Sequence, residues 1–117
     1  MKTILIVEDI ELNIELLIQI LEDDYNLLIA KDGVQGVAMA QQNNPDLILM
    51  DISLPEIDGY EATRTIRKTC QFIPIIGLSA HAMNSDIDKA LAAGCNDYLI
   101  KPVDENLLMK KLKEYLG

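Results

Sequence analysis

The chain has 117 residues, of which 50% are hydrophobic and 25% are charged, a composition that suits one compact globular domain. Its formal net charge of -9 at pH 7 leaves little of the cationic surface that binds nucleic-acid phosphates, so we expect no nucleic-acid partner. No apolar run approaches the roughly 20 residues that a membrane-spanning helix needs. The N-terminus leads directly into a strand-like run and not into a signal peptide. We therefore predict a soluble, cytoplasmic protein without membrane insertion.

The two cysteines, Cys70 and Cys95, have a spacing that fits neither a metal knuckle nor a redox pair, so we predict reduced, structural thiols. The single histidine, His81, cannot form a zinc site alone, because such sites use about three or four ligands, and we expect it at the surface. No internal repeat, linker or low-complexity tract interrupts the sequence. We therefore take residues 1 to 117 as one domain.

The N-terminal part of the chain predicts two strands and two helices. Residues 2 to 7 include the apolar run Ile4-Leu5-Ile6-Val7, typical of a short buried strand, and two acids, Glu8 and Asp9, follow it. Residues 10 to 22 predict a helix whose buried face carries Leu16, Leu17, Ile20 and Leu21. Three more apolar residues flank this face and indicate either a wide buried surface or a docking ridge for a partner protein: Leu12, Ile14 and Ile18. A strand at residues 25 to 30 and a second helix follow.

The third strand, residues 46 to 51, contains an apolar run without alternation, residues 47 to 50, and ends on the carboxylate of Asp51. Strands of this type belong to parallel sheets that helices cover on both faces. Such sheets bind ligands in the crevice beyond the carboxyl ends of their strands, where a charge is costly unless it is used. Asp51 is therefore the first candidate for chemistry, the alternative being that it caps the following turn.

The C-terminal part of the chain predicts two more strands and three more helices. Asp58-Gly59 marks a loop before a short polar helix, residues 60 to 68, and a strand at residues 73 to 78 delivers Ser79. The next helix begins at Ser85, and its core-facing side chains are Ile87, Leu91 and Ala92. A fifth strand, residues 98 to 100, delivers Lys101 and Pro102. Asp104 caps the last helix, whose apolar side carries Leu107, Leu108, Leu112 and Tyr115.

Five strands that alternate with five helices predict an α/β fold with a parallel sheet between two layers of helices. The polar residues at the strand ends then meet at one edge of the sheet: Glu8, Asp9, Asp51, Ser79 and Lys101. Two carboxylates about 5 Å apart repel by roughly 3 kcal/mol at an effective dielectric near 20, so three of them call for a cation. Oxygen ligands suit Mg²⁺. A carboxylate beside a metal and a lysine can also accept a phosphoryl group.

In these motifs the sequence resembles the receiver domain of two-component response regulators, the family that includes single-domain regulators of chemotaxis and cell division. The resemblance extends from Ile4 to Leu116. It rests on five motifs in one order: Glu8-Asp9, Asp51, Leu54-Pro55 with Asp58-Gly59, Ser79-Ala80, and Lys101-Pro102. It implies a flavodoxin-like three-layer sandwich, whose five-stranded parallel sheet has the order 2-1-3-4-5.

The resemblance also implies a role for each acid. Asp51 would be the phosphoacceptor. Asp9, Asp51 and the backbone carbonyl of Ser53 would bind Mg²⁺, and Glu8 would assist through a metal-bound water. Ser53 and His81 occupy places that often tune the lifetime of the phosphate.

Ser79 and Lys101 would contact the phosphoryl group by the same resemblance. Tyr98 would be the aromatic switch that turns inward when Ser79 is drawn to the phosphate. The structural alternatives are a strand-end cap for Ser79 and a residue at the edge of the core for Tyr98. The family further implies a cis peptide bond before Pro102.

The function implied is a phosphorylation-dependent protein-binding switch that works as a monomer. A histidine kinase or a histidine phosphotransfer protein would phosphorylate Asp51 after docking on the first helix, and a downstream target protein would bind the face around Tyr98. The domain would catalyse nothing beyond its own magnesium-dependent phosphoryl transfer and autodephosphorylation. The chain would be a complete regulator or a receiver from a hybrid kinase or multidomain regulator.

Two other functions compete with this one. A phosphatase of the haloacid dehalogenase type is disfavoured, because such enzymes place a general acid where this chain has Ser53. A phosphorylation-independent adaptor has little support, because all the acids of the pocket are present.

Overall fold

The structure is a computed structural model that describes residues 1–80 and 83–117, so His81 lies outside the described residues. Within them, five strands alternate with five helices. The strands are β1 (Thr3–Val7), β2 (Asn26–Ala30), β3 (Leu47–Asp51), β4 (Ile75–Ser79) and β5 (Asp97–Ile100). The helices are α1 (Glu11–Leu21), α2 (Gly33–Asn43), α3 (Gly59–Arg67), α4 (Asn84–Ala93) and α5 (Glu105–Leu116). No helix in this part of the chain is both long and apolar enough to cross a membrane.

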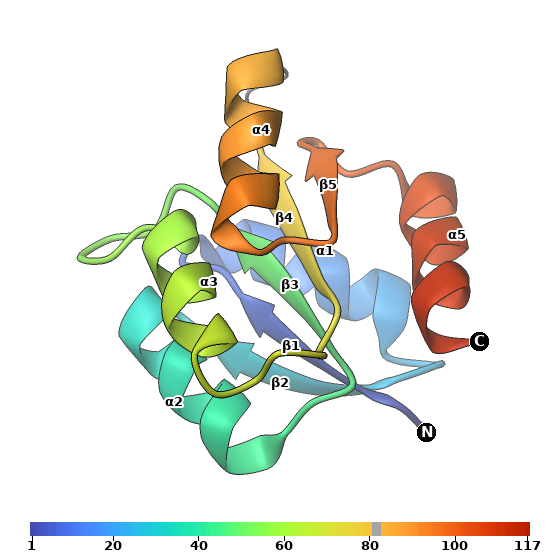
Figure 1. Cartoon of the computed structure of the whole chain (residues 1–117). Coiled ribbons are helices and arrows are strands. Elements are labelled where there is room, and N and C mark those ends of the chain that lie inside the picture. Colours follow the sequence, from blue (N-terminus) through green and yellow to red (C-terminus); the bar gives the residue numbers. More distant parts are fainter. Residues whose placement is uncertain (81–82) are drawn as a thin grey trace.

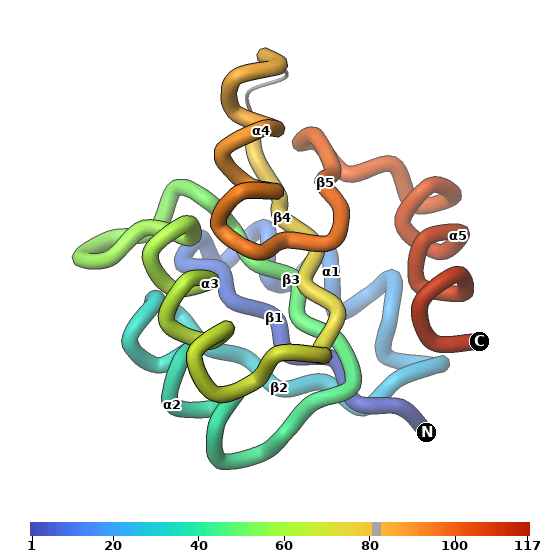
Figure 2. The backbone as a smooth tube through the Cα atoms, viewed as in Figure 1, coloured from blue at the N-terminus to red at the C-terminus, as the bar shows by residue number. Residues whose placement is uncertain are grey.

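The strands form one parallel sheet in the order β2-β1-β3-β4-β5, which confirms the predicted topology. The chain path in Figure 2 shows why the carboxyl ends of the strands share one edge: after each of the first four strands, a helix returns the chain to the opposite edge before the next strand begins. This arrangement places residues from distant parts of the sequence around one cleft.

Helices cover both faces of the sheet (Figure 1), because alternate residues of the buried strands point to opposite sides. Leu5 and Val7 of β1 pack in a core with residues of α2, α3 and α4. Ile4 and Ile6 pack in a second core with residues of α1 and α5. The absence of polar residues from these strands, apart from their ends, is thus explained by burial on both faces.

The core faces predicted for three helices are wrong in part, although Leu17 and Leu21 of α1 and Leu108 and Leu112 of α5 are buried as predicted. In α1, Ile14 is buried and Leu16 is 49% exposed. In α4, the predicted Leu91 is 47% exposed and the buried residues are Ala90 and Ala93. In α5, the predicted Leu107 is 44% exposed. Each helix has more apolar residues than one face can bury, and a small rotation about its axis decides which of them contact the sheet.

The predicted start of α4 at Ser85 is also wrong. The helix begins at Asn84, and its N-cap residue, Met83, makes no side-chain hydrogen bond to the first turn. By contrast, Asp104 caps α5 as predicted, because its side chain accepts a hydrogen bond from the backbone N–H of Leu107 at 3.1 Å. Helix α4 therefore lacks the side-chain cap that α5 has.

Candidate functional site

Four charged side chains meet at the carboxyl ends of β1, β3 and β5. Glu8 and Asp9 follow β1, Asp51 ends β3, and Lys101 follows β5. One carboxylate oxygen from each of the three acids lies within 4.8 Å of the others. The Nζ atom of Lys101 lies 2.8 Å from Oε1 of Glu8 and 3.1 Å from Oδ1 of Asp51. The structure thus brings together three carboxylates and one ammonium group from three strands.

The acids differ sharply in burial. Glu8 is completely buried and Asp51 is 2% exposed, whereas Asp9 is exposed. Backbone groups compensate the buried charges: Oε2 of Glu8 accepts hydrogen bonds from the N–H groups of Asp9 at 3.0 Å and Ile10 at 3.3 Å. Oδ1 of Asp51 accepts one from the N–H of Ser53 at 3.2 Å. Buried carboxylates are stable only with such donors, so the loops after β1 and β3 are shaped around these side chains.

The surroundings of Lys101 keep its ammonium group charged. Burial by itself lowers the pKa of Lys101, but the hydrogen bond to Glu8 and the negative charges of Asp51 and Glu8 outweigh that effect. The net result is a raised pKa. Lys101 therefore remains a cation at neutral pH, beside the carboxylate of Asp51.

The charges of the site suit a divalent cation. Three carboxylates against one ammonium group leave two negative charges unbalanced. Asp9 is exposed, and within the described part of the chain its carboxylate makes no hydrogen bond or ion pair. Clustered carboxylate oxygens that are open to solvent on one side are the ligands of Mg²⁺. The residues present therefore fit the predicted magnesium site.

The cleft above these acids has a volume of about 450 Å³. Its lining includes Asp51, Ser53, Ala80 and Lys101, and also one residue that the sequence analysis did not single out, Asn13. Asn13 lies in the first turn of α1, directly after the acidic pair of β1. Its place in that turn was the only sequence signal that it could reach the cleft.

Ser79 and Tyr98 lie on neighbouring strands. Ser79 follows Leu78, which pairs with Asp51, and its side chain is buried. Tyr98 pairs with Gly77, is half-buried and packs against the core on the α4 side of the sheet, so it is not part of the cleft lining. The peptide bond between Lys101 and Pro102 is cis, as the resemblance implied.

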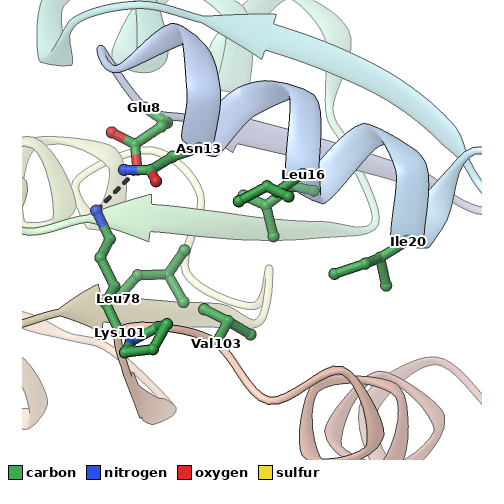
Figure 3. Close-up of a pocket in the computed structure, with 9 residues that line it drawn as sticks. Glu8, Asn13, Leu16, Ile20, Leu78, Lys101 and Val103 are labelled. Atoms are coloured by element: carbon green, nitrogen blue, oxygen red, sulfur yellow. Dashed lines mark hydrogen bonds and ion pairs between the residues drawn. The ribbon is translucent and has the colours of Figure 1, made fainter.

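A second, mainly apolar pocket of about 150 Å³ adjoins the cleft. Figure 3 shows Leu16 and Ile20 of α1 on one side of it and Leu78 and Val103 on the other. The ion pair of Glu8 and Lys101 closes one end. The exposed apolar side of α1 and the charged cleft are therefore adjacent surfaces.

Comparisons with known proteins show the family to which the chain belongs. The family model described as "Response regulator receiver domain" matches residues 4–113. The polar-differentiation response regulator DivK of Brucella ovis is 36% identical over 119 residues, which cover 99% of this chain and 97% of DivK.

Two solved structures are similar in both sequence and fold. The receiver domain of the sensor histidine kinase PA1611 from Pseudomonas aeruginosa, solved with a magnesium ion coordinated in its active-site cleft, is 39% identical with a TM-score of 0.92, over 99% of this chain and 98% of that one. The co-crystal structure of the Saccharomyces cerevisiae phosphotransfer protein Ypd1 with the receiver domain of Ssk1 gives 34% identity and a TM-score of 0.92, over 97% and 88%.

Proposed function

Because this chain belongs to the family of response regulator receiver domains of two-component systems, we propose that Asp51 is its phosphoacceptor. The observation that carries the proposal is the position of Asp51: its carboxylate ends a central strand, lies within 4.8 Å of two other acids, and contacts Lys101 at 3.1 Å. An aspartate so placed has a cation bound to one oxygen of its carboxylate, which leaves the other oxygen to receive the phosphoryl group.

The chemistry proposed is the transfer of one phosphoryl group. An oxygen of Asp51 attacks phosphorus, and the bond from phosphorus to the donor breaks. The electron pair of that bond leaves with the donor, which is a phosphohistidine nitrogen or, in vitro, the acetate of acetyl phosphate. Oδ1 of Asp51 is engaged by Lys101 and by the N–H of Ser53. We assign the attack to the other oxygen, Oδ2.

We propose that Asp9, Asp51 and the backbone carbonyl of Ser53 hold Mg²⁺, with Glu8 nearby. The bound ion would neutralise part of the charge on the phosphoryl oxygens during transfer. Lys101 would stabilise a further oxygen, since its ammonium group already lies beside Asp51 and stays charged. The same residues would serve when water removes the phosphoryl group again, which is the only other reaction we assign to the domain.

Ser79 and Tyr98 form the proposed switch. Ser79 ends the strand next to Asp51, and Tyr98 lies one strand further along the sheet, packed towards α4. Phosphorylation adds roughly 1.5 to 2 negative charges. Drawing the Ser79 hydroxyl towards that charge would open space for the ring of Tyr98 to move inward and so change the surface of α4 and β5.

Exposed apolar side chains support the proposed partners. Leu12 and Leu16 on α1 are 64% and 49% exposed, and Leu16 lines the apolar pocket next to the cleft, which suits docking of a histidine kinase or phosphotransfer protein. Leu91 on α4, Ile100 on β5 and Leu107 on α5 are 44% to 47% exposed, which suits a target protein on the other side. The cytoplasmic location, the monomeric state and the extent of the domain, residues 1 to 117, stay predictions.

The test is incubation of the purified chain with Mg²⁺ and acetyl phosphate, followed by intact mass measurement. We expect a gain of one phosphoryl group that Asp51→Asn abolishes. Asp88→Asn, on the exposed side of α4, is the matched control and should be phosphorylated like the native protein. The proposal is wrong if the native chain gains no mass, or if Asp51→Asn gains as much as the native chain.

A further inference from the structure

Both carboxylate oxygens of Glu8 accept hydrogen bonds from groups of the protein itself. Oε2 accepts the two backbone N–H groups of Asp9 and Ile10, and Oε1 accepts the ammonium group of Lys101 at 2.8 Å. The side chain has no exposed surface. Asp9, the next residue, differs from Glu8. It is exposed, and no group in the described part of the chain binds its carboxylate. The two adjacent acids are therefore built for different tasks.

Lys101 depends on Glu8 for its position. Its Nζ lies closer to Glu8 than to Asp51, at 2.8 Å against 3.1 Å, and its side chain is 20% exposed. A lysine side chain has a flexible stem of four carbons, so an ammonium group without a second anchor samples several positions. Glu8 follows β1 and Asp51 ends β3, and the ammonium group that bridges them is therefore fixed in two directions.

We infer that Glu8 is a positioning residue that holds Lys101 beside Asp51, and that it does not serve the metal ion directly. The inference rests on the proposed function, in which Lys101 stabilises the phosphoryl group. It assigns direct ligation to Asp9 and Asp51, whose oxygens are not all taken up by the protein. It also requires that the contact between Glu8 and Lys101 persists when Mg²⁺ binds.

The chain offers an internal control for this contact. Lys111 of α5 is paired with Asp97 of β5 at 2.9 Å, and its side chain is also 20% exposed. This second pair lies outside the cleft lining. Any change that Mg²⁺ causes at Lys101 but not at Lys111 is thus specific to the site.

The first test follows both ammonium groups by proton–nitrogen NMR without a phosphodonor. Lys101→Met and Lys111→Met assign the two signals, and Mg²⁺ is then added to the native protein up to saturation. We expect the Lys101 signal to stay in slow exchange with water, as the Lys111 signal does. Loss of the Lys101 signal on Mg²⁺ binding, with Lys111 unchanged, would overturn the inference, because the metal would then have taken the oxygen of Glu8.

The second test uses Glu8→Gln, which keeps an oxygen for the two backbone N–H groups but removes the acceptor for Lys101. The rate of Asp51 phosphorylation by acetyl phosphate is measured at saturating Mg²⁺, with and without Lys101→Met. We expect Glu8→Gln to lower the rate at least three times more when Lys101 is present than when it is replaced. Equal losses in the two backgrounds, or no loss, contradict a role through Lys101.

The two tests fail separately from the proposed function. The NMR titration needs no phosphorylation, and it uses the native protein, so poor folding of a variant does not affect it. A chain that gains a phosphoryl group on Asp51 but loses the Lys101 signal with Mg²⁺ would keep the proposed function and refute the role of Glu8.

Discussion

The backbone of Gly59 lies directly against that of Asp51: a Cβ atom added at Gly59 would meet the carbonyl oxygen of Asp51 and lie 2.7 Å from the Cα of Ile52. The N-terminus of α3 thus packs on the strand end that carries the candidate phosphoacceptor. The N–H of Gly59 also donates to the carbonyl of Ile52 at 2.9 Å. The two atoms that the added Cβ would meet belong to the backbone, so they cannot move aside as a flexible side chain can.

Gly59→Ala should therefore push α3 away from β3. We expect the free energy of unfolding to fall by about 2 kcal/mol or more, in the range of overpacked sites. The phosphorylation rate of Asp51 should fall as well, because its loop moves. Urea unfolding and the acetyl phosphate assay measure the two effects. Gly77→Ala, where the added Cβ comes no closer than 3.4 Å to a neighbouring atom, is the control, and an equal stability for both variants would contradict the prediction.

Asp9→Asn should stabilise the protein in the absence of Mg²⁺. Asp9 is exposed and lies within 4.8 Å of two carboxylates, so without a cation its charge is mainly repelled. Solvent screening reduces the gain to about 1 kcal/mol in the free energy of unfolding. In saturating Mg²⁺ the native protein should be stabilised more than the variant. Thermal unfolding with and without Mg²⁺ measures both effects. If Mg²⁺ stabilises Asp9→Asn as much as it stabilises the native chain, Asp9 is excluded as a ligand.

Arg67 should contribute more to stability than any exposed ion pair of this surface. Its guanidinium group donates to the carbonyls of Gly94 at 2.9 Å and Cys70 at 3.0 Å and to the side chain of Asn96 at 2.7 Å. These contacts join the ends of α3 and α4 to the start of β5. In Arg67→Lys a single ammonium group cannot reproduce the planar set of donors of the guanidinium group. We expect the free energy of unfolding to fall by about 2 kcal/mol.

Arg64→Lys is the matched control for that measurement. Arg64 pairs with Glu61 on the same helix, and both side chains are more than half exposed. Exposed pairs of this kind contribute about 0.5 kcal/mol or less. Chemical denaturation of both variants should separate them clearly, and similar losses would show that the contacts of Arg67 are not worth more than a surface pair.

Cys95 should make stability fall with rising pH. Burial raises the pKa of its thiol above the ordinary 9.0, although a hydrogen bond with Thr63 and the charge of Arg67 oppose the shift. As pH rises past 9, the unfolded chain loses this proton before the folded chain does, so the free energy of unfolding decreases; below 9 the contribution is fully present. Urea unfolding at about pH 7.5 and pH 9.5 should show a smaller decrease in Cys95→Ala than in the native protein. Equal decreases would exclude Cys95 as the source.

The strands and their ends could be predicted because they depend on local signals. Continuous apolar runs identify strands buried on both faces, and the position of Asp51 at the end of such a run already places it at the ligand-binding edge. Helix orientation could not be predicted in the same way. Leu16, Leu91 and Leu107 are as apolar as the buried residues of their helices, so the sequence does not distinguish them. Only packing against the sheet decides which residue is covered.

Long-range polar contacts could not be predicted from the sequence either. The bonds of Arg67 to Asn96 and of Lys101 to Glu8 join residues 29 and 93 positions apart. Periodicity carries no information about such pairs. The role of Glu8 as an anchor, and not simply as one acid of a cluster, became visible only when each of its oxygens could be assigned a donor.

The ten residues of α4 bury only two alanines, and no side chain caps the helix start. Small side chains contribute little hydrophobic free energy, so local opening of this segment costs less than global unfolding. Its backbone amides should exchange with deuterium ahead of those in α5, which buries two leucines and has a side-chain cap. A signal that reaches α4 therefore arrives at a part of the molecule that can be reorganised while the sheet stays intact.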